Sequence, residues 1–176
     1  MIFSSEPALA DFAKSLGVFL IGSKHFPLCL ELVGDVGAGK TTFTRYLAEG
    51  LGVKSPITSP SFTISKHYFF TSKSHDSSAC EKCDSHQSST SIDKTNTFEL
   101  IHYDFYRLDD PGLMADDLAE SLSQTNTVVV LEWADSVSNI LPKNHPKITF
   151  KILSNGSRDL TFNKPMQALL AQIKGK

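Results

Sequence analysis

The chain has 176 residues, 40% of them hydrophobic, and a formal net charge of −2 at pH 7. This length favours a single α/β domain with a sizeable core, and the near-neutral charge disfavours direct binding to nucleic acid. The sequence has no run of 18 apolar residues, which disfavours a membrane span, and no basic N-terminal segment before an apolar stretch, which disfavours a secretory signal. The odd number of cysteines disfavours a disulfide framework. A cytoplasmic protein is therefore expected.

The first third of the chain predicts a helix, a strand and a second helix. Residues 5–20 carry apolar side chains at helical spacing, and Ser5 can cap that helix. Residues 28–33 form a short apolar run that is typical of a buried strand. A helical pattern follows over 42–51, and Gly52 fits its end.

Between that strand and that helix, residues 34–41 read Gly-Asp-Val-Gly-Ala-Gly-Lys-Thr, which fits the P-loop pattern G-x-x-x-x-G-K-[ST]. Glycines allow the backbone N–H groups of such a loop to face phosphate oxygens, and the helix adds its positive end. Lys40 can then reach the β- and γ-phosphates, and the Thr41 hydroxyl can bind Mg²⁺. A dinucleotide fingerprint fits less well, because Thr42 stands where its third glycine would be.

The rest of the chain alternates between strands and helices. One strand is predicted to follow residue 62 and to end at Phe70. Further strands are predicted over 98–104, 127–131, 148–153 and 160–162, and helices over 113–122 and 166–173. With the P-loop, this order predicts a P-loop NTPase-like, three-layer α/β fold whose mostly parallel central sheet carries added antiparallel strands.

Two acidic residues, Asp104 and Glu132, stand at the ends of predicted strands. Because open α/β sheets bind ligands at the carboxyl ends of their strands, Asp104 is a candidate Mg²⁺ ligand. Glu132 is a second candidate metal-shell group, or the residue that orients an attacking water. The alternative for both is a solvated acid at a strand end. Ser61, in the segment 58–61, can supply a hydroxyl that senses a γ-phosphate; the alternative there is a serine-capped proline turn.

Four motifs follow one another along the chain: the P-loop through Thr42, Ser-Pro-Ser-Phe at 59–62, His-Tyr-Asp-Phe-Tyr-Arg-Leu at 102–108, and Leu-Glu-Trp at 131–133. Motifs in this order resemble the TsaE family, bacterial ATPases needed for threonylcarbamoyl modification of the tRNA adenosine beside the anticodon. The resemblance covers nearly the whole chain outside 71–97.

The resemblance implies ATP and Mg²⁺ as cofactors and assigns roles to individual residues. Thr41, Asp104 and Glu132 would organise Mg²⁺, and Lys40 would join the two acids as a catalytic group. The residues expected to hold ATP are Gly34, Gly37, Ala38, Gly39, Lys40, Thr41, Thr42, Ser61 and Arg158. The implied partners are TsaD and TsaB type proteins, with tRNA reached only through the complex and no membrane involved.

The chain departs from the family pattern in places. Ser61 replaces a usual threonine, which preserves the hydroxyl, and Ala8 stands where an N-terminal threonine often approaches the nucleotide base. His102 receives no role from the sequence, since a strand histidine is commonly a packed side chain. Trp133 is interpreted as a packing residue beside the site.

Two other functions stay open at this point. A small-molecule P-loop kinase would clamp the transferred phosphate with arginines, and the chain has only Arg45, Arg107 and Arg158. None of these three has an obvious finger-like loop, so hydrolysis by the isolated chain should be slow and should rise with partners. A nucleotide-sensing module without turnover is the other alternative.

Residues 71–92 are rich in serine and poor in aliphatic side chains, so they cannot bury enough surface to fold alone. They predict a mobile insertion, at about 71–97 in all, that is dispensable for ATP binding. The segment also holds His75, Cys80, Cys83 and His86, so a zinc site is an alternative. A docking segment that orders on a partner is another.

Overall fold

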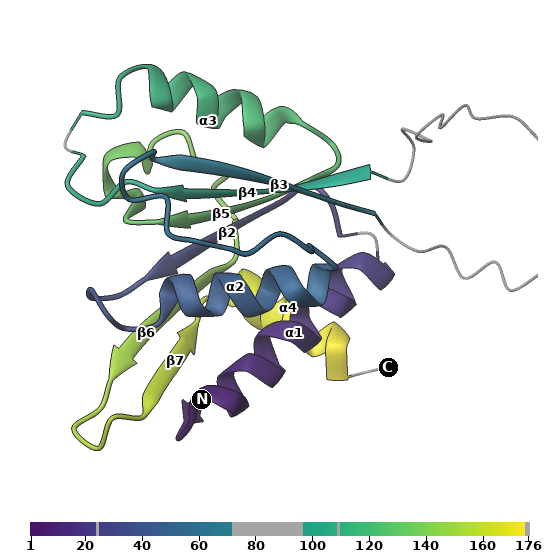
Figure 1. Ribbon diagram of the computed structural model, residues 1–176, viewed down its shortest axis with the longest axis vertical. Helices are drawn as coiled ribbons and strands as arrows, with labels where there is room; N and C mark the ends of the chain where they lie inside the picture. Colours follow the sequence, from purple (N-terminus) through teal and green to yellow (C-terminus); the bar gives the residue numbers. More distant parts are fainter. Residues whose placement is uncertain (24, 72–96, 109, 175–176) are drawn as a thin grey trace, which may run out of the picture.

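The computed structural model of the chain describes residues 1–23, 25–71, 97–108 and 110–174. Within these residues, seven strands form one sheet in the order β1-β7-β6-β2-β5-β4-β3 (Figure 1). The strands are β1 Ile2–Phe3, β2 Leu28–Val33, β3 Ser65–Thr71, β4 Thr97–Asp104, β5 Thr127–Glu132, β6 Lys147–Ile152 and β7 Arg158–Phe162. The helices are α1 Glu6–Ser23, α2 Lys40–Leu51, α3 Leu113–Ser123, α4 Lys164–Lys174 and the 3₁₀ helix η2 Ala134–Val137.

The four central strands are parallel, and the strands outside them are antiparallel. β2 pairs in parallel with β5 and β6, and β4 pairs in parallel with β5. β3 joins β4, β7 joins β6 and β1 joins β7 in antiparallel fashion. This arrangement confirms the predicted α/β fold with a mostly parallel centre and added antiparallel strands.

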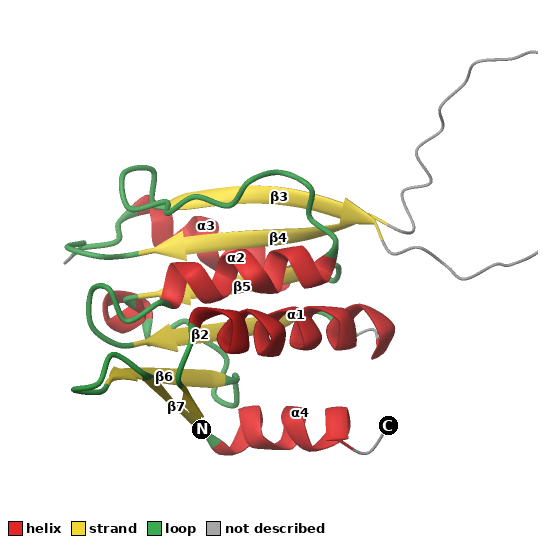
Figure 2. Cartoon of the chain, turned by 60° about the horizontal axis from the view of Figure 1, so that its bottom comes forward, coloured by secondary structure: helices red, strands yellow, loops and turns green. Residues whose placement is uncertain are grey.

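Helices cover both faces of the sheet (Figure 2). α1, α2 and α4 lie on one face over a core that includes Leu30 and Leu32 of β2, and α3 lies on the other over a core that includes Cys29. β2 and β5 are therefore buried on both faces, which explains why their sequences are mostly apolar, with Glu31 as the charged exception within β2.

Close packing between α1 and α2 holds α2 in place. A Cβ added to Gly17 of α1 would lie 2.5 Å from the Leu47 carbonyl oxygen, and one added to Gly50 of α2 would collide with the Lys14 carbonyl. Only glycine allows this approach, so the two helices fix the direction in which the first turn of α2 points.

The predicted elements lie within a few residues of the observed ones, with two exceptions. The sequence interpretation missed β1 and η2, which are two and four residues long. α2 also begins at Lys40, directly after the glycines, and ends as predicted at Gly52, whose φ of 86° is left-handed.

The predicted insertion at 71–97 meets the described residues only at its ends. Thr71 and Thr97 are paired residues of β3 and β4 and so belong to the sheet. The interior of the segment, with His75, Cys80, Cys83 and His86, lies outside the described residues.

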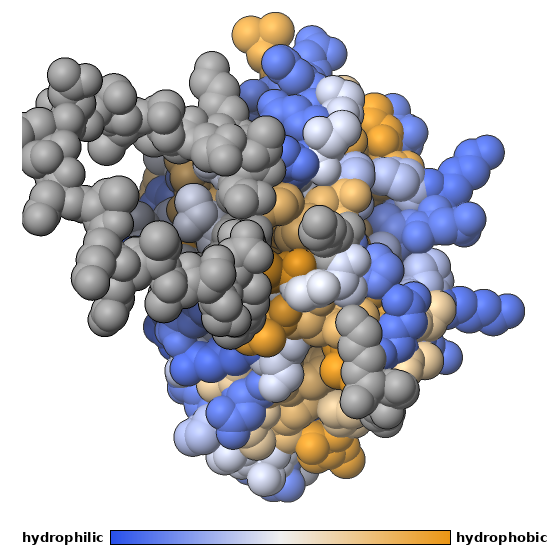
Figure 3. Space-filling model, turned by 90° about the vertical axis from the view of Figure 1, so that its right-hand side faces the viewer, coloured by the Kyte–Doolittle hydropathy of each residue, from blue (hydrophilic) through white to orange (hydrophobic). Residues whose placement is uncertain are grey.

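No helix in the described residues is long and apolar enough to cross a bilayer. In Figure 1 the carboxyl end of β2 and the start of α2 lie on the left. Figure 3 shows the opposite, right-hand end, where hydrophobic and hydrophilic side chains are mixed on the visible surface. That mixture of side chains does not by itself indicate a ligand-binding site.

A charged cluster ties β2 to β6. Nε2 of His145 lies 2.5 Å from Oε2 of the buried Glu31, and the Lys147 ammonium donates to the same oxygen at 2.8 Å. Nδ1 of His145 lies 2.6 Å from the Pro142 carbonyl oxygen, so an imidazolium can donate from both nitrogens. The bond to Glu31 raises the pKa of His145 against the effect of burial. Burial alone would raise the pKa of Glu31, but the bonds from His145 and Lys147 outweigh it and lower that pKa.

These shifts predict a pH-dependent contribution to stability. The raised His145 pKa adds stability that is complete below about pH 6.5 and is lost as pH rises through that raised pKa. The lowered Glu31 pKa adds stability that is complete above about pH 4.3 and is lost as pH falls through the lowered pKa. Both contributions to stability are therefore complete between about pH 4.3 and about pH 6.5.

Glu31→Gln should lower the free energy of unfolding at pH 6 by about 1–2 kcal/mol, since it removes a charged hydrogen-bond acceptor. The difference from the wild type should shrink as pH rises above the His145 pKa. Urea unfolding between pH 5 and 9 measures this. Glu49→Gln, which breaks the exposed pair with Lys14, is the control and should change little. Equal stability of wild type and Glu31→Gln at pH 6 would contradict the assignment.

Candidate active site

A cleft of about 680 Å³ lies at the carboxyl ends of the parallel strands, above the start of α2. Parallel α/β sheets bind ligands at this edge. The lining residues are Val36, Gly37, Gly39, Lys40, Thr41, Thr42, Ser59, Ser61, Phe62, Asp104, Tyr106, Arg107, Glu132 and Trp133.

The glycine-rich loop that connects β2 to α2 has a backbone that needs its glycines. Gly37 and Gly39 have φ values of 78° and 104°, which other residues rarely adopt. Gly34 has a φ of 145°, and a Cβ there would lie 2.5 Å from the Phe150 carbonyl oxygen. The P-loop pattern in the sequence thus corresponds to a loop that side chains would distort.

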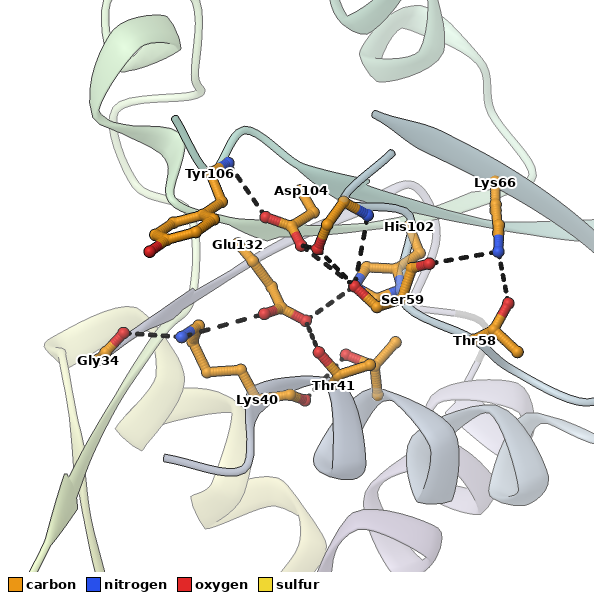
Figure 4. A network of polar contacts seen from close by, with 12 residues as sticks. Gly34, Lys40, Thr41, Thr58, Ser59, Lys66, His102, Asp104, Tyr106 and Glu132 are labelled. Carbon is orange, nitrogen blue, oxygen red and sulfur yellow. Dashed lines mark hydrogen bonds and ion pairs between the residues drawn. The ribbon is translucent and has the colours of Figure 1, made fainter. Parts of the chain in front are cut away.

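Lys40 is a buried cation at the centre of the cleft, with 4% of its surface exposed. Its Nζ donates to the carbonyl oxygens of Gly34 at 2.7 Å and Asp35 at 3.0 Å (Figure 4). It also lies 4.5 Å from the centroid of the Trp133 ring, within range of a cation–π contact. Burial lowers the pKa of Lys40, while the carboxylates of Glu132, Asp104 and Asp35 oppose that shift.

The two predicted acids lie side by side. Asp104 of β4 and Glu132 of β5 are register partners on adjacent parallel strands, and they are 5% and 3% exposed. The Thr41 hydroxyl donates to Oε1 of Glu132 at 2.8 Å, and Oε2 lies 4.0 Å from Nζ of Lys40. Two buried carboxylates and a hydroxyl form an oxygen-only donor set, which is the kind that Mg²⁺ prefers. These side chains therefore fit the expected metal.

The loop before β3 closes one side of the cleft. Hydroxyl groups of Ser61 and Ser59 donate to Oδ2 of Asp104 at 2.5 and 3.3 Å, and the Tyr106 N–H donates to Oδ1 at 3.1 Å. The Lys66 ammonium of β3 holds the loop through the Thr58 hydroxyl and the Ser59 carbonyl. The predicted hydroxyl at Ser61 thus contacts a predicted metal ligand.

The remaining predicted site residues lie elsewhere. Arg158 lines a smaller pocket of about 180 Å³, to which Gly39 and Thr42 also contribute. Ala38 is buried in the core and Gly34 packs on Phe150, so neither lines the main cleft. Ala8 lines neither of these two pockets.

Several residues of the site were missed from the sequence. His102 does not line the cleft, but its Nε2 is 2.9 Å from Oε1 of Glu132, which does. Its spacing of two residues from Asp104 was the available signal, because alternate residues of a strand share a face. Phe62 and Tyr106 also line the cleft, and Phe62 is fully exposed.

The sequence shows no obvious finger-like loop for any of the three arginines, but the structure places Arg107 at the cleft. This exposed residue lines the cleft from the turn after β4, where its φ is 62°. Its guanidinium lies 4.8 Å from the Tyr106 ring centroid. No sequence feature signals a left-handed arginine, because the conformation is unusual for a residue with a Cβ.

The fold and the cleft together define a P-loop NTPase-like α/β protein. Comparison with known families then identifies the group. The family model described as "Threonylcarbamoyl adenosine biosynthesis protein TsaE" matches residues 3–160, and the chain belongs to this family.

Individual relatives agree with this assignment. The chain is 32% identical over 134 residues to the tRNA threonylcarbamoyladenosine biosynthesis protein TsaE of Bacillus subtilis, covering 76% of this chain and 67% of that protein. It is 30% identical over 158 residues to the TsaE of Borreliella burgdorferi, covering 88% and 92% respectively. The crystal structure of YdiB from Bacillus subtilis superposes with a TM-score of 0.65 at 25% identity, covering 99% of this chain and 93% of that one.

Proposed function

We propose that this chain is a Mg²⁺-dependent ATPase that acts in tRNA threonylcarbamoyladenosine biosynthesis, where it drives turnover of a complex with TsaD and TsaB type partners. The observation that carries the proposal is the convergence of Lys40, Thr41, Asp104 and Glu132 on one cleft. Family membership supplies the biosynthetic context.

Each side chain has a task that follows from its chemistry. The Lys40 ammonium would pass from the loop carbonyls to the β- and γ-phosphates, whose charge it neutralises. Thr41 and Asp104 would hold Mg²⁺, with Glu132 close by, and the bound ion would neutralise charge on the β- and γ-oxygens. Glu132 would orient a water molecule for attack on the γ-phosphate through Oε2, since Oε1 already accepts two hydrogen bonds.

The smaller pocket extends the site toward the rest of a nucleotide. It adjoins the main cleft through Gly39 and Thr42, and Arg158 and Glu6 give it polar edges. We propose that Arg158 contacts the bound nucleotide there. A pocket of about 180 Å³ suits only part of a ligand, while the larger cleft of about 680 Å³ accommodates the phosphates and the metal.

The surface around the cleft supports a partner-dependent reaction. Val36 and Phe62 line the cleft and are 65% and 102% exposed, so two exposed apolar side chains lie beside its charged groups. A partner that covers them would exclude water and fix the segment that carries Ser61. The net charge of −2 makes a tRNA contact through partners more plausible than one through this chain.

A small-molecule kinase is a weaker candidate, although Arg107 lines the cleft. A kinase needs a site for a second substrate beside the γ-phosphate, whereas the family assignment provides a role without one. A sensing module without turnover would not need a carboxylate that orients water, which is the role proposed for Glu132.

Hydrolysis by the isolated chain should be slow, and the TsaD and TsaB type partners should raise kcat by about 10²-fold, since completing a catalytic geometry is worth that much. The rate of phosphate release from Mg²⁺-ATP, measured with and without the partners, tests this. Phe62→Ser should lower the stimulation while leaving the rate of the isolated chain unchanged. Fast hydrolysis by the pure chain that partners do not alter would refute partner-driven turnover, and no hydrolysis in either state would refute the ATPase.

A further inference from the structure

We propose that His102 is a positioning residue that orients the Glu132 carboxylate for attack of water on the nucleotide. This inference rests on the proposed ATPase function and names the group that prepares Glu132 for it. His102 does not line the cleft, so it acts through Glu132 and not on the substrate.

The hydrogen bonds of the histidine define its role. Its side chain is completely buried, and Nε2 lies 2.9 Å from Oε1 of Glu132 (Figure 4). A carboxylate only accepts hydrogen bonds, so Nε2 carries a proton and donates. In the neutral ring Nδ1 is then an acceptor, and it is buried with no hydrogen-bond partner in the described part of the chain.

That unpaired nitrogen argues against a purely structural role. A buried polar atom without a partner costs stability, and an apolar side chain of the same size would avoid the cost. The hydrogen bond from His102 to Glu132 is therefore the reason that a polar side chain occupies this position. Sites that do chemistry commonly contain such locally unfavourable groups.

Within the described residues the Glu132 carboxylate has three polar contacts, and of these partners His102 alone does not line the cleft. Thr41 donates to Oε1 at 2.8 Å, and Nζ of Lys40 lies 4.0 Å from Oε2. Both of these residues line the cleft and would engage the metal and the phosphates. His102 holds Oε1 from inside the sheet, so that Oε2 stays directed to the cleft throughout the reaction.

His102→Leu and His102→Gln in the full chain test this, assayed with the TsaD and TsaB type partners. Leucine keeps the volume but removes the donor, so kcat should fall by about 10–100-fold while the calorimetric Kd for Mg²⁺-ATP stays unchanged. Glutamine can place an amide N–H near the position of Nε2 and should recover part of kcat. The thermal midpoint of His102→Leu should equal or exceed that of the wild type.

Two further variants separate positioning from a general defect. In a Glu132→Gln background, His102→Leu should cause no further loss of hydrolysis, because the two residues act together and either change alone already removes their joint effect. His67→Leu is the matched control: it removes the exposed contact of 2.8 Å between His67 and Glu99 on the neighbouring strands β3 and β4. Its kcat should equal that of the wild type.

Unchanged kcat in His102→Leu, loss of Mg²⁺-ATP affinity, or additive effects of the two changes would overturn the proposal. If the wild type binds Mg²⁺-ATP but never hydrolyses it, the proposed ATPase function is wrong. A crystal structure then tests separately whether His102 orients the Glu132 carboxylate. In crystals of His102→Leu with Mg²⁺ and a non-hydrolysable ATP analogue, a displaced Glu132 carboxylate supports the role of His102, and an unmoved one overturns it.

Discussion

Lys40→Ala should abolish measurable binding of Mg²⁺-ATP, with an affinity loss of at least about 10²-fold, since a buried charge that loses its partner costs 2–5 kcal/mol. The ammonium stands at the end of the glycine-rich loop proposed to hold the phosphates, and it also offsets part of the charge of the buried Glu132 and Asp104. Without it, two carboxylates would face an anionic ligand with the metal alone between them. Isothermal titration calorimetry measures the change in Kd.

A matched control separates this effect from a general loss of charge. Lys66 is another lysine near the cleft, where it holds the loop through Thr58 and Ser59, but it does not line the cleft itself. Lys66→Ala should retain binding within a few-fold. The thermal midpoint of Lys40→Ala should show that the variant is folded. Near-native affinity in a folded Lys40→Ala protein would refute the assignment of the loop as a phosphate site.

The parts of the site that follow from local sequence could be predicted. The order of apolar strand, glycine-rich loop and helix is encoded within 24 consecutive residues, from Leu28 to Leu51. Asp104 and Glu132 could be placed together because each follows an apolar strand, and parallel strands end at one edge of a sheet. Their pairing in register is the geometric result of that rule.

The parts that depend on distant contacts could not be predicted. The bond between His102 and Glu132 joins residues 30 positions apart and requires the β4–β5 register. β1 is a strand because its two residues pair with β7 near the other end of the chain, which no local pattern records. Arg107 reaches the cleft through a left-handed turn that its residue type disfavours. Tertiary contacts override local preference in all three cases.

Glu132→Gln should lower hydrolysis by about 10²–10⁴-fold, the usual worth of a positioned general base, while Mg²⁺-ATP still binds. The amide keeps the size of the side chain, and its oxygen can still accept from Thr41 and His102, so the cleft keeps its shape. Removing a negative charge beside the phosphates should leave affinity equal to or higher than that of the wild type. Single-turnover hydrolysis and calorimetry on the same preparation separate the two effects.

Asp104→Asn and Glu99→Gln complete this series. Of the two acids, Asp104 is the one proposed to hold Mg²⁺, so its variant should lose hydrolysis and also bind ATP less tightly in Mg²⁺ than the wild type does. Glu99 also lies on β4, but it pairs with His67 outside the cleft, and its variant should behave as the wild type. If Glu132→Gln hydrolyses ATP at the wild-type rate, Glu132 does not orient the water. If it loses ATP binding instead, Glu132 belongs to the binding machinery, because a carboxylate needed only for the attack of water contributes nothing to ground-state affinity.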